Sequence, residues 1–301
     1  MIRVYYTYYE KETAEHGKIK ELEHRLGREL LCRGLKEIYG LQVSAENRSK
    51  GIKSSRGDLD SDDRSGTPAV DSLLAKEENG KPYIKDRPDI HFNISHCSGL
   101  VVCAFADKPV GIDAEMVKPV WDPLIRRVLH EQELQVLSRY GEIPEKGKRV
   151  SGAEDKNVSG PEDKNVSGTD EKKIRSREFL RLFFRYWTLK ESWLKQDGSG
   201  LTREPREICF SVDPDDWTSP VRASDPGKIC LQKKMVRNQD LPAEYILSVC
   251  VPNSSEGPSE GPDMGVDRSF FWTDIRSCPE EEQSSMNTDT EKQPLLHQYD
   301  T

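Results

Sequence analysis

Residues 175–196 carry the pattern that most limits the fold, because they describe one long amphipathic helix that stops at Gly198-Ser199-Gly200. Its apolar stripe comprises Leu180, Phe184, Trp187 and Leu194. Glu191 falls on the same stripe, where helical spacing predicts an apolar residue. A buried carboxylate without a partner is costly, so Glu191 needs a neutralising partner or a metal ion. Lys195, one turn later, offers the simpler alternative of an intrahelical ion pair.

A second carboxylate motif lies in the predicted strand Val110-Gly111-Ile112-Asp113-Ala114-Glu115. Strand side chains alternate, so Asp113 and Glu115 project from one face, beside a glycine that leaves room. Two like charges so close repel each other and favour a cation between them, although a solvated strand edge is the alternative. With Glu191 they make three carboxylates, which suit Mg²⁺, with Mn²⁺ as a second option; magnesium commonly shares its ligand shell with substrate phosphates.

The sequence contains no Walker loop and no Gly-x-Gly-x-x-Gly motif, so any phosphate would be held by other groups. The candidate donors are Arg25 on the first helix, Lys81 in a turn, Ser95 and His96 at a strand end, and Lys195. Each also has an ordinary structural interpretation: a solvated helix arginine, a turn lysine or a satisfied buried histidine.

The remaining pattern predicts an α+β chain. Strands are expected at 1–9, 90–95, 207–212, 228–235 and 244–251, and the strand at 90–95 is expected to be half-buried. Helices are expected at 18–39, capped by Gly40, and at 122–140, capped by Asp122. Residues 100–106 and 109–115 are expected to form a hairpin around Asp107-Lys108. Residues 44–70 are expected to form a flexible insert, and the VSGAEDKN-like repeats within 147–173 an enlarged surface loop. The segment Phe270-Phe271-Trp272 is either a docking motif or a site of local collapse.

Composition narrows the function classes. Residues 253–301 hold 11 acidic and 3 basic residues, which accounts for the whole net charge of −8. They are expected to be a disordered acidic tail, and the neutral remainder lacks the basic face of a nucleic-acid-binding protein. The seven cysteines show no C-x-x-C pair, which is typical of reduced thiols. No signal peptide and no membrane-length apolar run are apparent, so a cytoplasmic protein without a membrane partner is expected.

Four motifs in order resemble those of the Sfp-type 4′-phosphopantetheinyl transferases of the holo-acyl-carrier-protein synthase superfamily. They read G-K-P-Y at 80–83, F-N-I-S-H at 92–96, G-I-D-A-E at 111–115 and W-T-L-K-E-S-W-L-K at 187–195. The resemblance is close over about 80–115 and 184–201 and weaker over 1–43 and the last strands, and the inserts and the tail have no counterpart.

The resemblance implies two similar halves related by pseudo-two-fold symmetry, each a small sheet packed on a long helix. The expected division is residues 1–109, residues 110–252 with the metal site, and the tail 253–301. Coenzyme A would bind between the halves of a monomer as co-substrate, and an acyl or peptidyl carrier protein would accept the phosphopantetheine, with release of 3′,5′-ADP.

The resemblance also implies residue roles. Asp113, Glu115 and Glu191 would hold magnesium, Lys195 would reach the pyrophosphate, and Ser95 and His96 would contact the phosphates. Gly80, Lys81 and Pro82 would flank the adenine, and Arg25, or alternatively Arg28, would bind the 3′-phosphate. Glu191 or a metal-bound water would be the general base, with Lys195 as the second catalytic residue. Two rival functions are a non-catalytic adaptor for coenzyme A or carrier proteins and a metal-dependent pyrophosphohydrolase.

Overall fold

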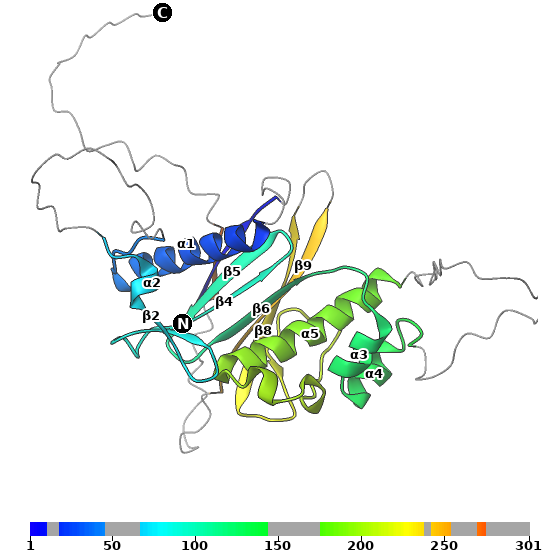
Figure 1. Cartoon of the computed structure of the whole chain (residues 1–301). Coiled ribbons are helices and arrows are strands. Elements are labelled where there is room, and N and C mark those ends of the chain that lie inside the picture. The colour runs from blue at the N-terminus through cyan, green and yellow to red at the C-terminus, as the bar shows by residue number, and fades with distance from the viewer. Residues whose placement is uncertain (11–17, 46–66, 144–174, 238–241, 254–269, 275–301) are drawn as a thin grey trace, which may run out of the picture.

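The structure is a computed structural model that describes residues 1–10, 18–45, 67–143, 175–237, 242–253 and 270–274. It contains two four-stranded sheets, and each lies against one 21-residue helix (Figure 1). The expected α+β fold class, with a small sheet on a long helix in each half, is confirmed. The inserts expected at 44–70 and 147–173 lie largely outside the described residues.

The first sheet has the strand order β10-β1-β5-β4. Its strands are β1 (Ile2–Tyr8), β4 (His91–Cys97), β5 (Leu100–Ala106) and β10 (Phe270–Asp274). Helix α1 (Ile19–Tyr39) packs Leu30, Leu31 and Leu35 against this sheet. It ends at Gly40, whose left-handed backbone (φ 68°) is favoured by glycine, as the sequence predicted. A short helix α2 (Val70–Leu73) and the hairpin of β2 (Leu74–Lys76) with β3 (Pro82–Ile84) cover its edge.

The second sheet has the order β6-β9-β8-β7. Its strands are β6 (Gly111–Met116), β7 (Val221–Arg222), β8 (Lys228–Arg237) and β9 (Ala243–Pro252). Helix α5 (Arg177–Asp197) begins where the Ser176 hydroxyl accepts the Phe179 N–H, and it ends at Gly198 (φ 74°). Helices α3 (Asp122–Val128) and α4 (Glu131–Leu137) and the 3-10 turns η3 (Gly200–Thr202) and η4 (Pro205–Glu207) pack around α5.

A shared core joins the two halves. It combines Val102 and Ala104 of β5 with Ile112 of β6 and Leu247 of β9, all buried. This packing places β4 beside β6 across the junction, where the Asn93 side-chain Oδ1 accepts the Ile112 N–H at 2.9 Å.

The predicted hairpin of residues 100–106 with 109–115 is wrong. β5 pairs with β1 and β4, whereas β6 pairs with β9 in the other sheet. The hairpin partner of β5 is β4, through a turn at Gly99 with φ 87°. Short chain separation favoured the hairpin, but β6 buries Ile112 and Ala114 in the shared core instead.

The single helix predicted at 122–140 is two helices. The backbone is extended at Leu129 and His130, which ends α3 and starts α4. The His130 ring accepts the Gln132 N–H, and the Glu133 carboxylate accepts the His130 N–H, so the break is stabilised by a capping box. Asp122 is the first residue of α3 and does not cap it; its carboxylate pairs with Arg175.

Two strand predictions also change. Residues 207–212 form only an isolated bridge at Phe210, because the Phe210 N–H and the Ile208 carbonyl bind the side chains of Glu133 and Lys190 rather than a neighbouring strand. In β4 the polar face is not solvated: Asn93 and Ser95 are 7% and 5% exposed, because β6 of the second half covers them.

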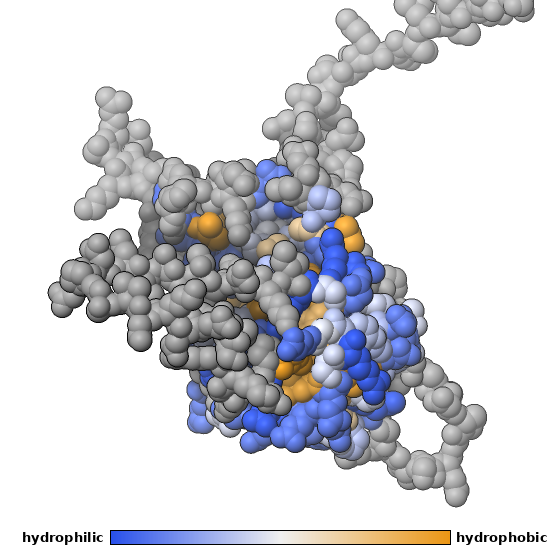
Figure 2. All heavy atoms as spheres, turned by 90° about the vertical axis from the view of Figure 1, so that its right-hand side faces the viewer, coloured by the Kyte–Doolittle hydropathy of each residue, from blue (hydrophilic) through white to orange (hydrophobic). Residues whose placement is uncertain are grey.

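The described surface is mainly hydrophilic on the face drawn in Figure 2, where apolar residues occupy small separate areas. Within the described ranges, no helix is both long and apolar enough to cross a membrane. The six described cysteines are free thiols, as predicted; Cys278 lies outside the described residues.

Candidate active site at the junction of the two halves

Gly111 sets the position of α5 on β6. A Cβ atom at residue 111 would lie 2.1 Å from the Ser192 carbonyl oxygen and 2.4 Å from the Gln196 nitrogen. Only glycine allows the helix backbone to approach the strand this closely. The sequence predicted a glycine that leaves room beside the carboxylates, and the structure shows that the helix fills this room. Asp113 on the strand thereby lies next to the last turns of α5.

Asp113 is the centre of a cluster built from three elements. Its Oδ1 accepts hydrogen bonds from the Lys195 ammonium of α5 at 2.5 Å and from the Ser95 hydroxyl of β4 at 3.0 Å. The Lys195 ammonium also lies 3.3 Å from the Ser95 hydroxyl. Asp113 is 4% exposed, and its Oδ2 is buried with no hydrogen-bond partner among the residues that the structure describes. Such an atom is uncommon in a folded protein and calls for a ligand.

Burial and the charge of Asp113 shift the pKa values of both Glu115 and Glu191. Burial raises the pKa of Glu115, and the charge of Asp113 raises it further. Burial and Asp113 likewise raise the pKa of Glu191, against a lowering effect of Lys195. For Lys195, burial acts to lower the pKa, but Asp113, Glu191 and Glu115 together outweigh burial and raise it. The strand and helix carboxylates therefore form one coupled group with an excess of negative charge.

The chemistry of this group fits a hard divalent cation. Among the described residues, no three His, Cys, Asp or Glu side chains stand in an arrangement that would already hold a metal ion. The free Oδ2 of Asp113 and the two glutamates with raised pKa values nevertheless supply the oxygen ligands that magnesium prefers. A bound cation would satisfy the buried oxygen and relieve the repulsion.

Ser95 and His96, the β4 residues predicted to contact phosphates, lie at the same junction of the two halves. Ser95 joins the cluster directly, and His96, the next residue of β4, is 44% exposed and pairs through Nδ1 with the Glu23 carboxylate of α1 at 3.2 Å. Tyr9 also donates its hydroxyl to Glu23, so the end of β1 fixes this carboxylate. His96 is thus not the fully buried histidine of the alternative interpretation.

The other residues predicted to contact the ligand, Arg25 or Arg28 and Pro82, are not part of the Asp113 cluster. Arg25 of α1 is 60% exposed, with Glu29 3.9 Å away, whereas Arg28 is held by Asp71 at 2.6 Å. Of the two candidates for the 3′-phosphate, Arg25 is therefore the less engaged. Pro82 opens β3.

Lys81 has a structural partner set that the sequence did not predict. Its ammonium donates to the Gln196 carbonyl at 2.5 Å and to the Val110 carbonyl at 3.2 Å. It therefore ties the turn of the first half to the last turn of α5 and the start of β6, and its predicted place beside an adenine stays a prediction.

Sequence reasoning missed Lys190, the residue before Glu191. Its ammonium is 1% exposed and lies 2.6 Å from the Glu133 carboxylate, which is fully buried. It also donates to the carbonyls of Pro205 and Ile208. The available signal was a lysine next to the apolar stripe, but its partners come from α4 and η4, far along the chain. This pair holds α4 and the 205–210 segment against the helix that presents Glu191 and Lys195.

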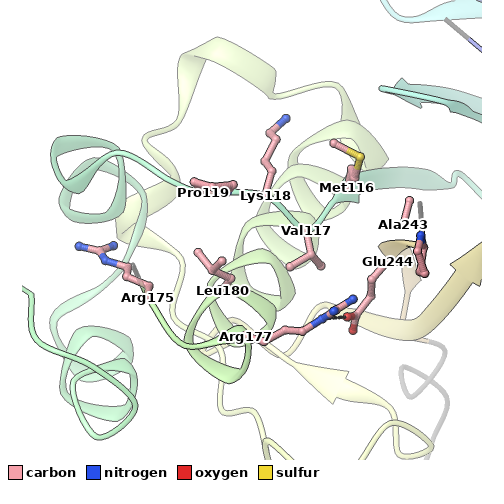
Figure 3. A pocket seen from close by; sticks show the side chains of 10 residues that line it. Met116, Val117, Lys118, Pro119, Arg175, Arg177, Leu180, Ala243 and Glu244 are labelled. Carbon is pink, nitrogen blue, oxygen red and sulfur yellow. Dashed lines mark hydrogen bonds and ion pairs between the residues drawn. The ribbon is translucent and has the colours of Figure 1, made fainter. Parts of the chain in front are cut away.

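A groove of ≈ 460 Å³ opens near the carboxyl end of β6. It is lined by the segment Met116–Pro119, the start of α5 and the start of β9, including Lys118, Arg177 and Leu180 (Figure 3). The Lys118 ammonium lies 3.3 Å from the Glu115 carboxylate, so Glu115 of β6 adjoins the groove. Of the groove residues, only Leu180 was singled out from the sequence, as part of the apolar stripe of α5.

Comparison with known proteins identifies the family. Residues 109–250 match the sequence model of the 4′-phosphopantetheinyl transferase superfamily, a range that contains β6, α5 and nearly all of the second sheet. Over these residues, slightly less than half of the chain, the sequence is similar to this superfamily. The predicted family is therefore confirmed over the segment that carries Asp113, Glu115, Glu191 and Lys195, whereas Ser95 and His96 lie outside the matched range.

Individual relatives agree. The chain is 33% identical to 4′-phosphopantetheinyl transferase Sfp of Bacillus subtilis over 180 residues, which cover 60% of this chain and 63% of the relative. It is 26% identical to 4′-phosphopantetheinyl transferase psf-1 of Bacillus pumilus over 61% of this chain and 62% of that protein. The transferase HetI of Nostoc is 28% identical over 45% of this chain and 46% of its own length. These matches span less than two thirds of each relative.

Proposed function

We propose that this chain transfers 4′-phosphopantetheine from coenzyme A to a serine of an acyl or peptidyl carrier protein, with magnesium as cofactor. The observation that carries the proposal is the cluster of Ser95, Asp113 and Lys195, contributed by both halves and joined by the charges of Glu115 and Glu191. It combines cationic and hydroxyl donors for phosphate oxygens with carboxylates for a metal. The relatives named as phosphopantetheinyl transferases support the same reaction.

In the proposed reaction, the serine oxygen of the carrier attacks the β-phosphorus of coenzyme A. A new P–O bond forms, the bond to the bridging pyrophosphate oxygen breaks, and 3′,5′-ADP leaves with that oxygen. Glu191, directly or through an intervening water, receives the serine proton. Lys195 stabilises the charge that develops on the pyrophosphate.

The proposed metal ligands are Asp113, Glu115 and Glu191. When bound, the cation would neutralise the phosphoryl oxygens and the carboxylates together. Ser95 and His96 would position the phosphates from the end of β4, and Arg25 would bind the 3′-phosphate at the edge of α1. Lys81 and Pro82 would lie beside the adenine.

One experiment separates the proposal from its two rivals. Purified chain, coenzyme A, Mg²⁺ and an apo carrier protein are incubated, and the carrier is analysed by intact mass. A carrier heavier by one phosphopantetheine, with one equivalent of 3′,5′-ADP, supports transfer. Coenzyme A binding without a mass shift indicates an adaptor, and cleavage of coenzyme A without carrier indicates a hydrolase.

The metal assignment has its own test. Asp113→Asn and Glu191→Gln should each lower the transfer rate by about 100-fold or more, because each removes a charged group from the reacting centre. Both should also weaken binding of Mn²⁺, measured by electron paramagnetic resonance without substrate. Glu178→Gln, an exposed change on the same helix, is the matched control. Near-normal rates and Mn²⁺ binding in either site variant would refute the assignment.

A further inference from the structure

Residues Phe270–Asp274 form a strand far from their neighbours in sequence. The preceding described strand, β9, ends at Pro252 in the second sheet, where the Asn253 N–H binds the Gly227 carbonyl at 2.9 Å. β10 instead lies in the first sheet, parallel to β1, with Phe270 opposite Ile2 and Asp274 opposite Tyr6. The chain therefore returns from the second half to the first.

Without β10, β1 would be the outer strand of its sheet, since its other side pairs with β5. An edge strand presents unpaired N–H and C=O groups and accepts any extended segment of suitable sequence. The other end of the sheet is protected differently, because β4 meets β6 of the second half. β1 is thus the edge of this sheet that a further strand can join.

The sequence of the tail selects the segment that pairs. Residues 253–269 contain no aromatic residue and are rich in Gly, Pro, Ser and Glu, none of which favours a strand. Phe270-Phe271-Trp272-Thr273 is a run of four residues that all have high strand propensity. Of the two interpretations left open by the sequence, docking or local collapse, the pairing with β1 favours docking.

We infer that the β1 edge is a docking site for an extended peptide strand, and that Phe270–Asp274 of the same chain is its occupant. A five-residue strand binds weakly as a free peptide. Because this strand belongs to the same chain, its effective concentration at β1 is higher than that of a free peptide. The docked strand closes one edge of the first sheet, at the opposite end of the strand order from β4, which carries Ser95.

The test uses the full-length chain with Phe271→Pro and Trp272→Pro together. Adjacent strand N–H groups point to opposite sides, so one of these prolines removes a donor directed at β1 whichever way the strand faces. The matched control places Ser284→Pro and Ser285→Pro further along the tail. Hydrogen exchange of β1 and of residues 270–274 is measured together with the Tm.

In the Phe271/Trp272 variant, amide hydrogens of both segments should exchange at least tenfold faster. Its Tm should be lower by about 2–4 °C, the shift that a modest loss of stability produces in a chain of this size. The control should match the unmodified chain. A synthetic peptide of residues 268–276 should bind the Phe271/Trp272 variant and not the unmodified chain, whose edge is filled.

Three results would overturn the inference: unchanged β1 exchange in the Phe271/Trp272 variant, equal peptide binding to both chains, or a concentration-dependent dimer that dissociates in the variant. The last result would mean that the strand docks on a second copy rather than on its own chain. None of these readouts depends on the transfer reaction, so failure here leaves the proposed function intact.

Discussion

Lys195 directs its ammonium to Asp113 on β6, at 2.5 Å, rather than forming the simple intrahelical pair with Glu191 that its spacing allowed. Burial raises the pKa values of Glu115 and Glu191, and the shared neighbour Asp113 raises both further. For Lys195 burial acts to lower the pKa, and the nearby carboxylates, Asp113 foremost, outweigh it. At the scale of single residues, the site is therefore organised by one buried carboxylate. The closeness of strand and helix that makes this arrangement possible depends on one glycine.

Gly111→Ala should lower the free energy of unfolding by about 1–3 kcal/mol, the usual cost of forcing an added methyl into a packed site. The methyl would meet the backbone of Ser192 and Gln196, which cannot rotate away as a side chain can. Urea denaturation of the variant measures the loss.

Gly27→Ala is the matched control, because its nearest neighbours would be side chains, Ile94 at 3.3 Å and Val101 at 3.9 Å. Gly27 lies within α1, where alanine is the better helix former. A Gly111→Ala variant as stable as Gly27→Ala would show that α5 does not rest on β6 at this point.

At the scale of elements, α5 is fixed at both ends. Its carboxyl-terminal turns pack on Gly111, and its first turns are held by Glu244 of β9, which accepts from Arg177 at 2.9 Å and from Arg181 at 2.6 Å. Burial acts to raise the pKa of Glu244, but the two arginines outweigh it and lower the pKa below the ordinary value. Between these ends, the buried Lys190–Glu133 pair holds α4 in place.

The lowered pKa of Glu244 predicts a pH dependence of stability. A carboxyl group with a lower pKa in the folded chain stabilises it at pH values above the unfolded pKa, about 4.3 for glutamate. This contribution is lost as the pH falls from there through the folded pKa. Glu244→Gln should therefore cost about 1–3 kcal/mol at pH 7, as for hydrogen bonds to charged groups.

The difference between Glu244→Gln and the unmodified chain should shrink when urea denaturation is repeated at pH 5, 4.5 and 4. Glu178→Gln, whose carboxylate is 61% exposed, serves as the control with little effect at any pH. A difference that stays constant from pH 7 to pH 4 would contradict the role assigned to the two arginines.

At the scale of the whole molecule, the two halves are joined by a shared apolar core and by hydrogen bonds around it. Lys81 of the first half binds carbonyls of β6 and α5, and Arg237 at the end of β8 donates to the Tyr9 carbonyl at 3.0 Å. The Lys81 ammonium lies at the carboxyl end of α5, where a positive charge also complements the helix dipole. The site depends on these ties because its donors come from both halves.

Lys81→Met keeps the aliphatic stem and removes the charge. It should lower the free energy of unfolding by about 1–3 kcal/mol, and the Tm by about 2–4 °C per kcal/mol. Lys85→Met is the matched control, because Lys85 is exposed and its ammonium donates to Ser72 within the first half.

The same Lys81 variant separates two roles. A lower Tm in the absence of ligand would support the role of the Lys81 ammonium in holding the two halves together. An unchanged Tm with weaker coenzyme A binding, measured by calorimetry, would instead place Lys81 at the ligand and remove its structural assignment.

The sequence alone determined what depends on neighbours along the chain. Helical periodicity and terminal glycines located α1 and α5 to within a residue or two, and the alternation of β6 placed Asp113 and Glu115 on one face. The order of four short motifs predicted the superfamily. These signals are short-range, because propensity, capping and side-chain alternation act within a few residues.

Only the tertiary structure decided which elements meet. It placed β6 in the second sheet rather than in a hairpin with β5, divided residues 122–140 at His130, and added Phe270–Asp274 to β1. It also showed that Asn93 and Ser95 face a second half and not solvent, and that Lys190 is buried against Glu133. Apart from the break at His130, which a local capping box stabilises, these outcomes depend on partners between about 18 and 270 positions away. Pairing over such distances is set by burial in a shared core, which no local pattern records.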